Sequence, residues 1–410
     1  MPWEIRPIAP DELPTFIRVD GAAYSSPQTD EDIEAARGPF EFDRSLAAIE
    51  DGRFIGADGA LSFDLTLPSY TTIPVAGVTW VAVLPTHRRR GLLTALMRRQ
   101  LEDVRARGEA LAVLTASESA IYRRFGYGAA TSVMYTEIER AHSAFLSLVN
   151  IAGRYRLVEH EEAISEILPP LYDEVRRARV GELSRTSAKW KSQYRTPNAP
   201  FNGFGPRLYS VYETDSGRVD GAVIYRAKLE WTNGVPDGTL QVSELIARTP
   251  EAYAALWRYC LDVDLVARVR GLHRPVDEPL RWMLADSRRL RVTHLADNLW
   301  VRLLDIPAAL SARRYATEGQ LTFEVSDAFL PDLAGRYTLE GATDGADCAR
   351  SDHPADLSLD VAALGAAYLG GVSFTSLAQA GLVREETLGA LARADAMFAT
   401  FPAPYCSTPF

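Results

Sequence analysis

Residues 85–97, PTHRRRGLLTALM, place three arginines and a glycine directly before a leucine-rich run. The apolar stretch VTWVAV (78–83) precedes them, and leucines recur afterwards with the spacing of one buried helix face (Leu92, Leu93, Leu96, Leu101). A helix start already carries partial positive charge, so Asp or Glu would be the usual residues there. Arginines at this place therefore indicate an anion site, with a pyrophosphate as the natural ligand. A solvated basic turn is the alternative.

Composition and charge limit the class of partner. The chain has 410 residues, with 44 Lys and Arg against 54 Asp and Glu, which gives a net charge of −10. This acidic balance argues against nucleic acid as a partner and suits a cationic substrate. The chain contains neither GxxxxGK[ST] nor GxGxxG, so a P-loop and a dinucleotide fingerprint are excluded.

Cysteine and histidine spacing gives no sign of a metal site. The three cysteines, Cys260, Cys348 and Cys406, are far apart and odd in number, and the six histidines show no HxxxH or HExxH spacing. We therefore expect no disulfide framework and no metal.

The sequence shows no signal-peptide pattern and no apolar run of membrane-spanning length, so we expect a cytoplasmic protein without membrane partners.

The element pattern divides the chain into three segments. Residues 1–145 read as a mixed domain with an open, largely antiparallel sheet, a GADG turn at 56–59 and a last strand, TSVMYTEI (131–138). Residues 146–295 weakly repeat this order, with ELIARTPEAYAALW (244–257) in the place of the arginine turn but without its arginines and glycine. Residues 296–410 begin with the strand NLWVRLLD and end in the apolar FPAPYCSTPF, which we expect to be packed.

The arginine turn resembles motif A of the GCN5-related N-acetyltransferases, Arg/Gln-x-x-Gly-x-Gly/Ala. Arg88 and Gly91 match this motif, whereas Leu93 departs from its last small position. The resemblance implies acetyl-CoA as co-substrate, with the backbone of one strand pairing with the pantetheine arm and the turn binding the pyrophosphate. It assigns the strand role to Val81, Ala82 and Val83, and the turn role to Arg88, Arg89, Arg90, Gly91, Leu92, Leu93 and Thr94.

A second stretch, SESAIYRRFGYGAAT (117–131), resembles the Eis (enhanced intracellular survival) family of actinobacterial acetyltransferases. NLWVRLLDIPAALSARRY and LTFEVSDAF resemble the start of the third domain of that family. The resemblance implies an α+β protein: two tandem GCN5-related folds, the second degenerate, followed by a sterol-carrier-like domain. The domains would be residues 1–145, 146–295 and 296–410, with the C-terminus reaching the active site of the first.

The same resemblance assigns the proton-transfer groups. Tyr122 would be the general acid for the leaving thiolate, and Ser117 and Glu118 would border the cofactor; a packing role for Tyr122 is the alternative. Phe125 and Tyr127 are expected to be core aromatics. The first segment offers no convincing His or Glu base, and the resemblance supplies the terminal carboxylate of Phe410, acting through a water.

These features lead us to expect an acetyl-CoA-dependent N-acetyltransferase. By resemblance, its acceptors would be amines of polycationic small molecules, aminoglycosides above all, and the chain would form a homo-oligomer, with a hexamer favoured. A lipid- or sterol-carrying module and a CoA-binding regulatory protein without turnover are the alternatives. Asp30, Glu31, Asp32 and Glu34 could form an acidic lip for a polycation, although a solvated helix face is the simpler interpretation.

Overall fold

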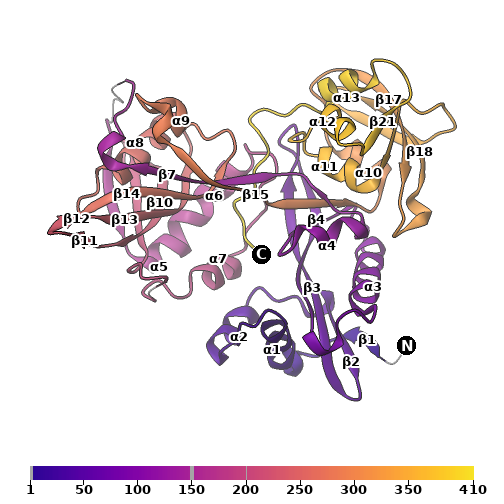
Figure 1. Ribbon diagram of the computed structural model, residues 1–410, viewed down its shortest axis with the longest axis horizontal. Coiled ribbons are helices and arrows are strands. Elements are labelled where there is room, and N and C mark those ends of the chain that lie inside the picture. Colours follow the sequence, from indigo (N-terminus) through magenta and orange to yellow (C-terminus); the bar gives the residue numbers. More distant parts are fainter. Residues whose placement is uncertain (1–2, 148–151, 200) are drawn as a thin grey trace. The chain divides into compact units, whose positions relative to one another are not determined.

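The computed structural model describes residues 3–147, 152–199 and 201–410, which form two compact units (Figure 1). The first unit comprises Met1–Thr131, the short segment Val180–Ser184 and Asp297–Phe410. The second comprises Ser132–Arg179 and Arg185–Ala296. Each unit is built around a seven-stranded sheet, and the first also contains a five-stranded sheet.

The large sheet of the first unit is antiparallel except at one pair of neighbours. Its strands follow the order β1 (Glu4–Pro7), β2 (Ser45–Glu50), β3 (Arg53–Thr66), β4 (Thr72–Val83), β5 (Leu111–Thr115), β16 (Leu299–Leu303) and β6 (Gly128–Ala129). Only β4 and β5 are parallel among these pairs, as a strand–helix–strand crossover requires. The open, largely antiparallel sheet expected for the first segment is present.

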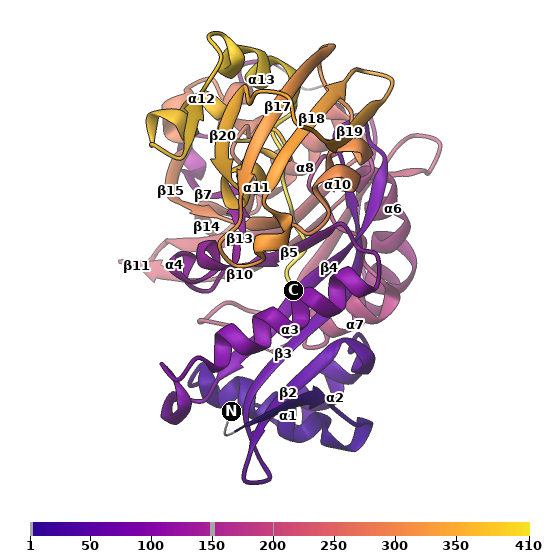
Figure 2. The ribbon, with the colours of Figure 1, turned by 90° about the vertical axis from the view of Figure 1, so that its right-hand side faces the viewer.

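Helices cover this sheet and carry the site. They are α1 (Leu13–Ala23), α2 (Asp30–Arg37), α3 (Leu92–Ala106) and α4 (Ser119–Tyr122). Of the residues expected from the leucine spacing, Leu92, Leu96 and Leu101 are buried, whereas Leu93 is only partly buried. Met97, Gln100 and Val104 complete the buried side of α3, which packs on β3 and β4 (Figure 2). Burial of this apolar stripe holds the start of α3 at the carboxyl end of β4.

The second unit repeats the strand–helix–strand arrangement. Its sheet follows the order β15 (Arg291–Asp297), β7 (Ser132–Glu139), β14 (Val266–Pro275), β13 (Gly238–Ala247), β10 (Val219–Lys228), β9 (Leu208–Glu213) and β8 (Arg154–Val158). Helix α8 (Pro250–Asp262) connects the parallel strands β13 and β14. Trp257 and Leu256 of α8 are fully buried in the core of this unit.

Two predicted strands lie in a different sheet from the one expected, and one predicted turn is wrong. TSVMYTEI forms β7 of the second sheet, and NLWVRLLD supplies β16, which pairs with β5 and β6 in the first sheet. Both segments are strands, as expected, but a strand's own residues do not reveal which strand it pairs with. The GADG segment is not a turn but part of the continuous strand β3, where Asp58 is buried. The compact units change at Thr131/Ser132 and at Ala296/Asp297, because β7 belongs to the second sheet and β16 to the first. The domain bounds at residues 145 and 295 stay predictions.

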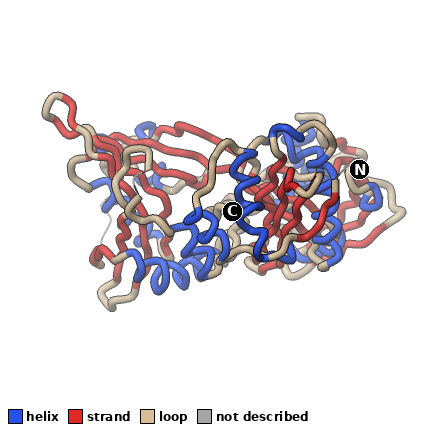
Figure 3. Tube along the Cα trace, turned by 90° about the horizontal axis from the view of Figure 1, so that it is seen from below, coloured by secondary structure: helices blue, strands red, loops and turns tan. Residues whose placement is uncertain are grey.

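The remainder of the first unit is a five-stranded sheet with helices. Strands β19 (Ala346–Arg350), β18 (Gly335–Gly341), β17 (Gly319–Ser326), β20 (Leu357–Asp360) and β21 (Val383–Glu385) lie in that order. Helices α10 (Ile306–Ala312), α11 (Val361–Ala367), α12 (Phe374–Gln379) and α13 (Ala390–Phe398) accompany them (Figure 1). Figure 3 distinguishes the helices, strands and loops of the chain by colour. Phe323, Phe374 and Phe398 stack or meet edge-on in its fully buried core.

Candidate active site

The site lies where β4 and β5 separate. The two strands share the register pairs Ala76↔Ala112 and Gly77↔Val113, although β4 continues to Val83 and β5 to Thr115. On its other side β4 carries an irregularity opposite Ala57–Gly59, where Trp80 has a φ of +53°. Such a bulge bends a strand and increases its twist. The carboxyl ends of β4 and β5 therefore border an opening into which an extended ligand arm can enter.

The start of α3 points unpaired donors at this opening. Gly91 is the N-cap with a φ of +87°, a conformation that favours glycine, and a Cβ there would have no heavy atom within 4 Å. No side chain caps this helix start. The first N–H groups of a helix lack intrahelical partners, so an anionic ligand can accept their hydrogen bonds.

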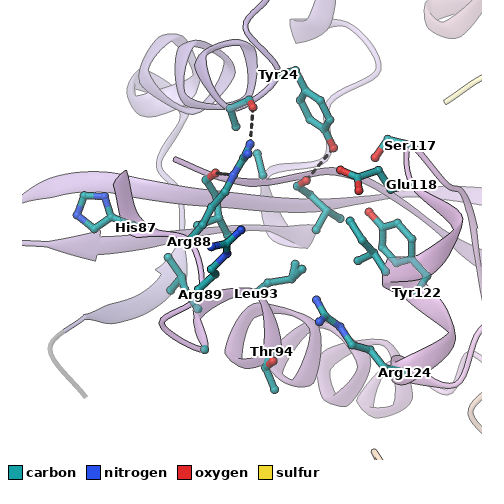
Figure 4. A pocket seen from close by; sticks show the side chains of 17 residues that line it. Tyr24, His87, Arg88, Arg89, Leu93, Thr94, Ser117, Glu118, Tyr122 and Arg124 are labelled. Carbon is teal, nitrogen blue, oxygen red and sulfur yellow. Dashed lines mark hydrogen bonds between the residues drawn. The ribbon is translucent and has the colours of Figure 1, made fainter. Parts of the chain in front are cut away.

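A cavity of about 370 Å³ extends from this helix start to α4. His87, Arg88 and Arg89 lie at one end of it, whereas Tyr24, Ser117, Glu118 and Tyr122 gather at the other (Figure 4). The full lining consists of Ala23, Tyr24, Val81, Ala82, Val83, His87, Arg88, Arg89, Gly91, Leu92, Leu93, Thr94, Ser117, Glu118, Ile121, Tyr122 and Arg124. The structure thus brings together all the sequence-predicted site residues except Arg90 and Phe410.

The three arginines have different roles in the fold. Arg88 donates to the carbonyl oxygen of Ala23 at 2.7 Å and to that of Val83 at 3.3 Å, so it joins α1 to the end of β4. Arg89 has a φ of +61° and lines the cavity. Arg90 lies outside the lining and donates to Glu50, with Nη2 at 2.6 Å from Oε1. This hydrogen bond lowers the pKa of Glu50, and His87 adds a smaller contribution.

Tyr122 is held almost entirely out of solvent. It ends α4, its exposed fraction is 5%, and its ring meets that of Tyr127 at a centroid distance of 6.1 Å. Burial raises the pKa of Tyr122, and the nearby Tyr24, Asp58 and Glu118 raise it further. The phenol is therefore neutral, and loaded with its proton, throughout the physiological pH range. Phe125 and Tyr127 are fully buried core aromatics, as expected.

Phe410 reaches the first sheet from the opposite end of the chain. Oγ1 of Thr115, the last residue of β5, lies 3.4 Å from a terminal oxygen of Phe410 and donates to it. The Phe410 ring packs on Phe63 at 5.1 Å between centroids and lies over Gly77 of β4. The end of the chain thus lies on the last strand pair before β4 and β5 separate.

Sequence reasoning missed several residues that line the cavity. Ile121 and Arg124 lie within AIYRRFGYG, so the motif itself was a signal for them. Tyr24 follows α1 with no pattern that marks it, yet its hydroxyl donates to the Val81 carbonyl at 3.0 Å. The acidic residues of α2 do not line the cavity: Asp30 pairs with Arg18, and Glu34 with Arg37.

In the part of the chain that the structure describes, no group of three or more His, Cys, Asp and Glu side chains is arranged to hold a metal ion. No helix in the same residues combines the length and apolar character that a membrane span needs.

The chain matches three domain families. Residues 4–130 match an acetyltransferase (GNAT) domain, residues 181–303 match a second acetyltransferase (GNAT) domain family, and residues 306–407 match the sterol carrier protein domain. The chain therefore has two GNAT domains followed by a sterol-carrier-like domain, in an α+β fold. This composition confirms the fold class expected from the sequence.

Comparison with individual proteins leads to the same family. An N-acetyltransferase of Streptomyces coelicolor, itself uncharacterized, is 42% identical over 92% of this chain and 92% of its own length. The N-acetyltransferase Eis of Mycobacterium tuberculosis is 33% identical over 85% of this chain and 87% of its own. The crystal structure of Eis1 from Mycobacterium abscessus superposes with a TM-score of 0.88 at 36% identity, covering 99% of this chain and 100% of that one. The chain belongs to the Eis family of GCN5-related N-acetyltransferases and is an acetyltransferase whose fold implies the use of acetyl-CoA.

Proposed function

We propose that this enzyme transfers the acetyl group of acetyl-CoA to amines of polycationic small molecules, with aminoglycosides as the favoured class. One observation carries the proposal. A single cavity has an uncapped helix start and two arginines at one end and a buried, neutral tyrosine at the other. An anionic, elongated thioester fits such a cavity with its phosphates at one end and its reacting carbon at the other.

The turn would hold the pyrophosphate. Arg88 and Arg89 supply charge, and the N–H groups after Gly91 supply donors that no side chain caps. Val81, Ala82 and Val83 line the same cavity, where their backbone would pair with the pantetheine arm. Leu93 and Thr94 border the phosphates from the first turn of α3, and Ser117 and Glu118 border the thioester end.

Tyr122 would protonate the leaving group. When the tetrahedral intermediate collapses, its C–S bond breaks and the electron pair goes to sulfur. A thiol of this kind has an ordinary pKa of about 8.5. Burial keeps the proton on Tyr122. The same burial disfavours an anion on the leaving sulfur, so the sulfur would take the proton of Tyr122 as the C–S bond breaks.

The terminal carboxylate of Phe410 would accept the proton of the attacking amine through a water. An alkyl ammonium has an ordinary pKa of about 10.4, so it must lose a proton before it can attack. The hydrogen bond from Thr115 at 3.4 Å supports a defined position for the chain end. The ring of Phe410, packed on Phe63 and Gly77, would act as the anchor.

A CoA-release assay across a panel of amines tests the substrate class. We expect aminoglycosides to give the highest kcat/KM, ahead of lysine-containing peptides and simple alkylamines, since the chain carries a net charge of −10. Turnover restricted to monoamines would contradict the polycation assignment while leaving acetyl transfer intact.

Extension of the chain tests the base. One glycine added after Phe410 would move the carboxylate by about 3.3–3.6 Å, which exceeds the reach of a hydrogen-bond relay. We expect kcat to fall by about 10²-fold or more with an unchanged Tm, whereas deletion of Phe410 should lower both. Phe410→Leu, which keeps an apolar anchor, should be the mildest change. A C-terminally extended enzyme with wild-type kcat would contradict the role of the carboxylate.

Lipid carriage is not favoured by any contact in the third domain. Phe323, Phe374 and Phe398 occupy the interior between its sheet and helices.

A homo-oligomer, with a hexamer favoured, is proposed from the family. Light scattering that gives the mass of one 45.2 kDa chain would reject it.

A further inference from the structure

The last ten residues follow a path bordered by glycines. A Cβ on Gly371 would contact the Pro404 ring at 3.3 Å, and one on Gly77 would contact the Phe410 ring at 3.2 Å. Between them, a Cβ on Gly181 would lie 2.9–3.3 Å from backbone atoms of Tyr405. Gly181 also has a φ of +94°. The C-terminal segment thus lies in close backbone contact with a part of the chain far from it in sequence.

That part is the five-residue segment Val180–Ser184, which belongs to the first unit although the residues on both sides of it belong to the second. One side of the segment is bonded to β3. The Gly181 amide donates to the Thr66 carbonyl at 2.9 Å, and the Thr66 amide donates to the Glu182 carbonyl at 2.9 Å. The Ser184 amide donates to the Asp64 carbonyl at 3.0 Å. The segment is therefore fixed on the sheet that carries the site.

The same segment holds the C-terminal residues. The Tyr405 amide donates to the Val180 carbonyl at 2.8 Å. The Ser407 amide and hydroxyl both donate to Oε2 of Glu182, at 2.9 and 3.0 Å. Glu182 is 5% exposed, so its carboxylate is a buried acceptor aimed at one residue of the C-terminal segment. Hydrogen bonds to a buried charged group are among the stronger ones in proteins.

Ser407 lies three residues before Phe410. Three extended residues span about 10 Å, so the position of Ser407 fixes how far the terminal carboxylate can reach. A displacement of about 1 Å can cost about 10²-fold in rate when a reacting group must be aligned. A firm hold on Ser407 would therefore matter for the rate more than for the fold.

We propose that Glu182 is a positioning residue for acetyl transfer: through Ser407 it holds the end of the chain so that the Phe410 carboxylate meets the attacking amine. The inference rests on the proposed role of Phe410. Residues 180–184, which connect two parts of the second unit, would then serve the active site of the first unit.

The test uses the full-length enzyme and three variants. In Glu182→Ala we expect kcat with a saturating amine to fall about tenfold or more, with an unchanged KM for acetyl-CoA. Glu182→Gln keeps an acceptor oxygen for both Ser407 donors and should restore most of kcat. Glu109→Ala is the matched control, because Glu109 is also a largely buried glutamate of the first unit, paired with Arg44 away from the C-terminal segment. It should lower Tm without the loss of kcat.

A second readout does not depend on activity. Carboxypeptidase should release Phe410 faster from Glu182→Ala than from the wild type, Glu182→Gln or Glu109→Ala. Unchanged release and unchanged kcat would overturn the proposal. Faster release with unchanged kcat would show that Glu182 holds the chain end without setting the rate, which overturns its positioning role. The base assignment itself is tested separately by the residue added after Phe410. If Glu182→Ala does not fold, Ser407→Gly, which removes the hydroxyl donor, should give the same two changes at smaller size.

Discussion

The two units each contain a strand, a helix and a parallel strand, β4–α3–β5 in the first and β13–α8–β14 in the second. In the second unit the parallel strands share five register pairs, from Gly238↔Val266 to Val242↔Gly271. In the first they share two and then separate. The starts of the two helices differ in a similar way, because the backbone N–H groups are capped in one and uncapped in the other. Thr249 caps α8 by accepting from the Ala252 amide at 3.1 Å, whereas no side chain caps α3.

The comparison indicates that the proposed acetyl-CoA site depends on backbone groups that the fold leaves unpaired. In the second unit the strand pairing and the helix cap satisfy the groups that an anionic, extended ligand would otherwise contact. The loss of the arginines and glycine is thus only the part of the difference that is visible in the sequence. A third difference lies after the second strand, where α4 ends in the buried Tyr122 but α9 (Leu280–Met283) carries Trp282, which is 77% exposed.

The largest effect is expected from removal of the Tyr122 hydroxyl, which tests the third difference. Tyr122→Phe should keep the affinity for acetyl-CoA and lower kcat by about 10²–10⁴-fold, because it removes a proton donor without changing the ring. Steady-state kinetics and calorimetry measure the two quantities.

Tyr127→Phe is the matched control for this substitution. The Tyr127 hydroxyl is buried and has no hydrogen-bond partner among the residues that the structure describes, so its removal should leave kcat within about threefold. A fall of less than threefold in Tyr122→Phe as well would make Tyr122 a packing residue.

The next effect concerns the helix start. Gly91→Glu should weaken acetyl-CoA binding by about 10²-fold or more, which corresponds to about 2.7 kcal/mol, because a carboxylate would occupy the anion site. Gly108→Glu is the control: it places the same side chain at a φ of +79°, also with open space, just beyond the other end of α3. Calorimetry that finds equal affinity in both variants would remove the pyrophosphate assignment.

A smaller effect is expected in the second unit. Thr249→Ala removes the cap of α8 and should lower local stability by about 1 kcal/mol, seen as about fivefold faster hydrogen exchange of the first α8 amides. The affinity for acetyl-CoA should not change. Altered affinity would mean that the second strand–helix–strand segment takes part in cofactor binding.

The smallest effect is the absence of an alkaline decline in kcat. A raised pKa keeps the Tyr122 phenol protonated through the range in which an ordinary tyrosine, with a pKa of about 10, begins to ionise. We therefore expect kcat not to fall between about pH 8 and pH 10. A decline there that is absent in the residual activity of Tyr122→Phe would show that the phenol ionises normally.

The sequence was informative where function depends on local pattern. The arginine turn, the helix after it and the AIYRRFGYG stretch are contiguous, and the structure brings nearly all of their predicted residues into one cavity. Prediction failed where geometry depends on distant pairing. The sequence predicted β7 and β16 as strands but could not identify their sheets. No local pattern signals that Tyr24 bonds Val81 or that Glu182 bonds Ser407.

The place of β16 in the first sheet has a consequence for folding during synthesis. β16 fills the place between β5 and β6, yet it is synthesised long after both of them. During translation the edge of β5 therefore stays unpaired until residues 299–303 leave the ribosome. An unpaired strand edge is prone to wrong pairing. Folding of the first sheet cannot finish domain by domain from the N-terminus. A nascent chain released before β16 would present the unpaired edge of β5 to chaperones and proteases.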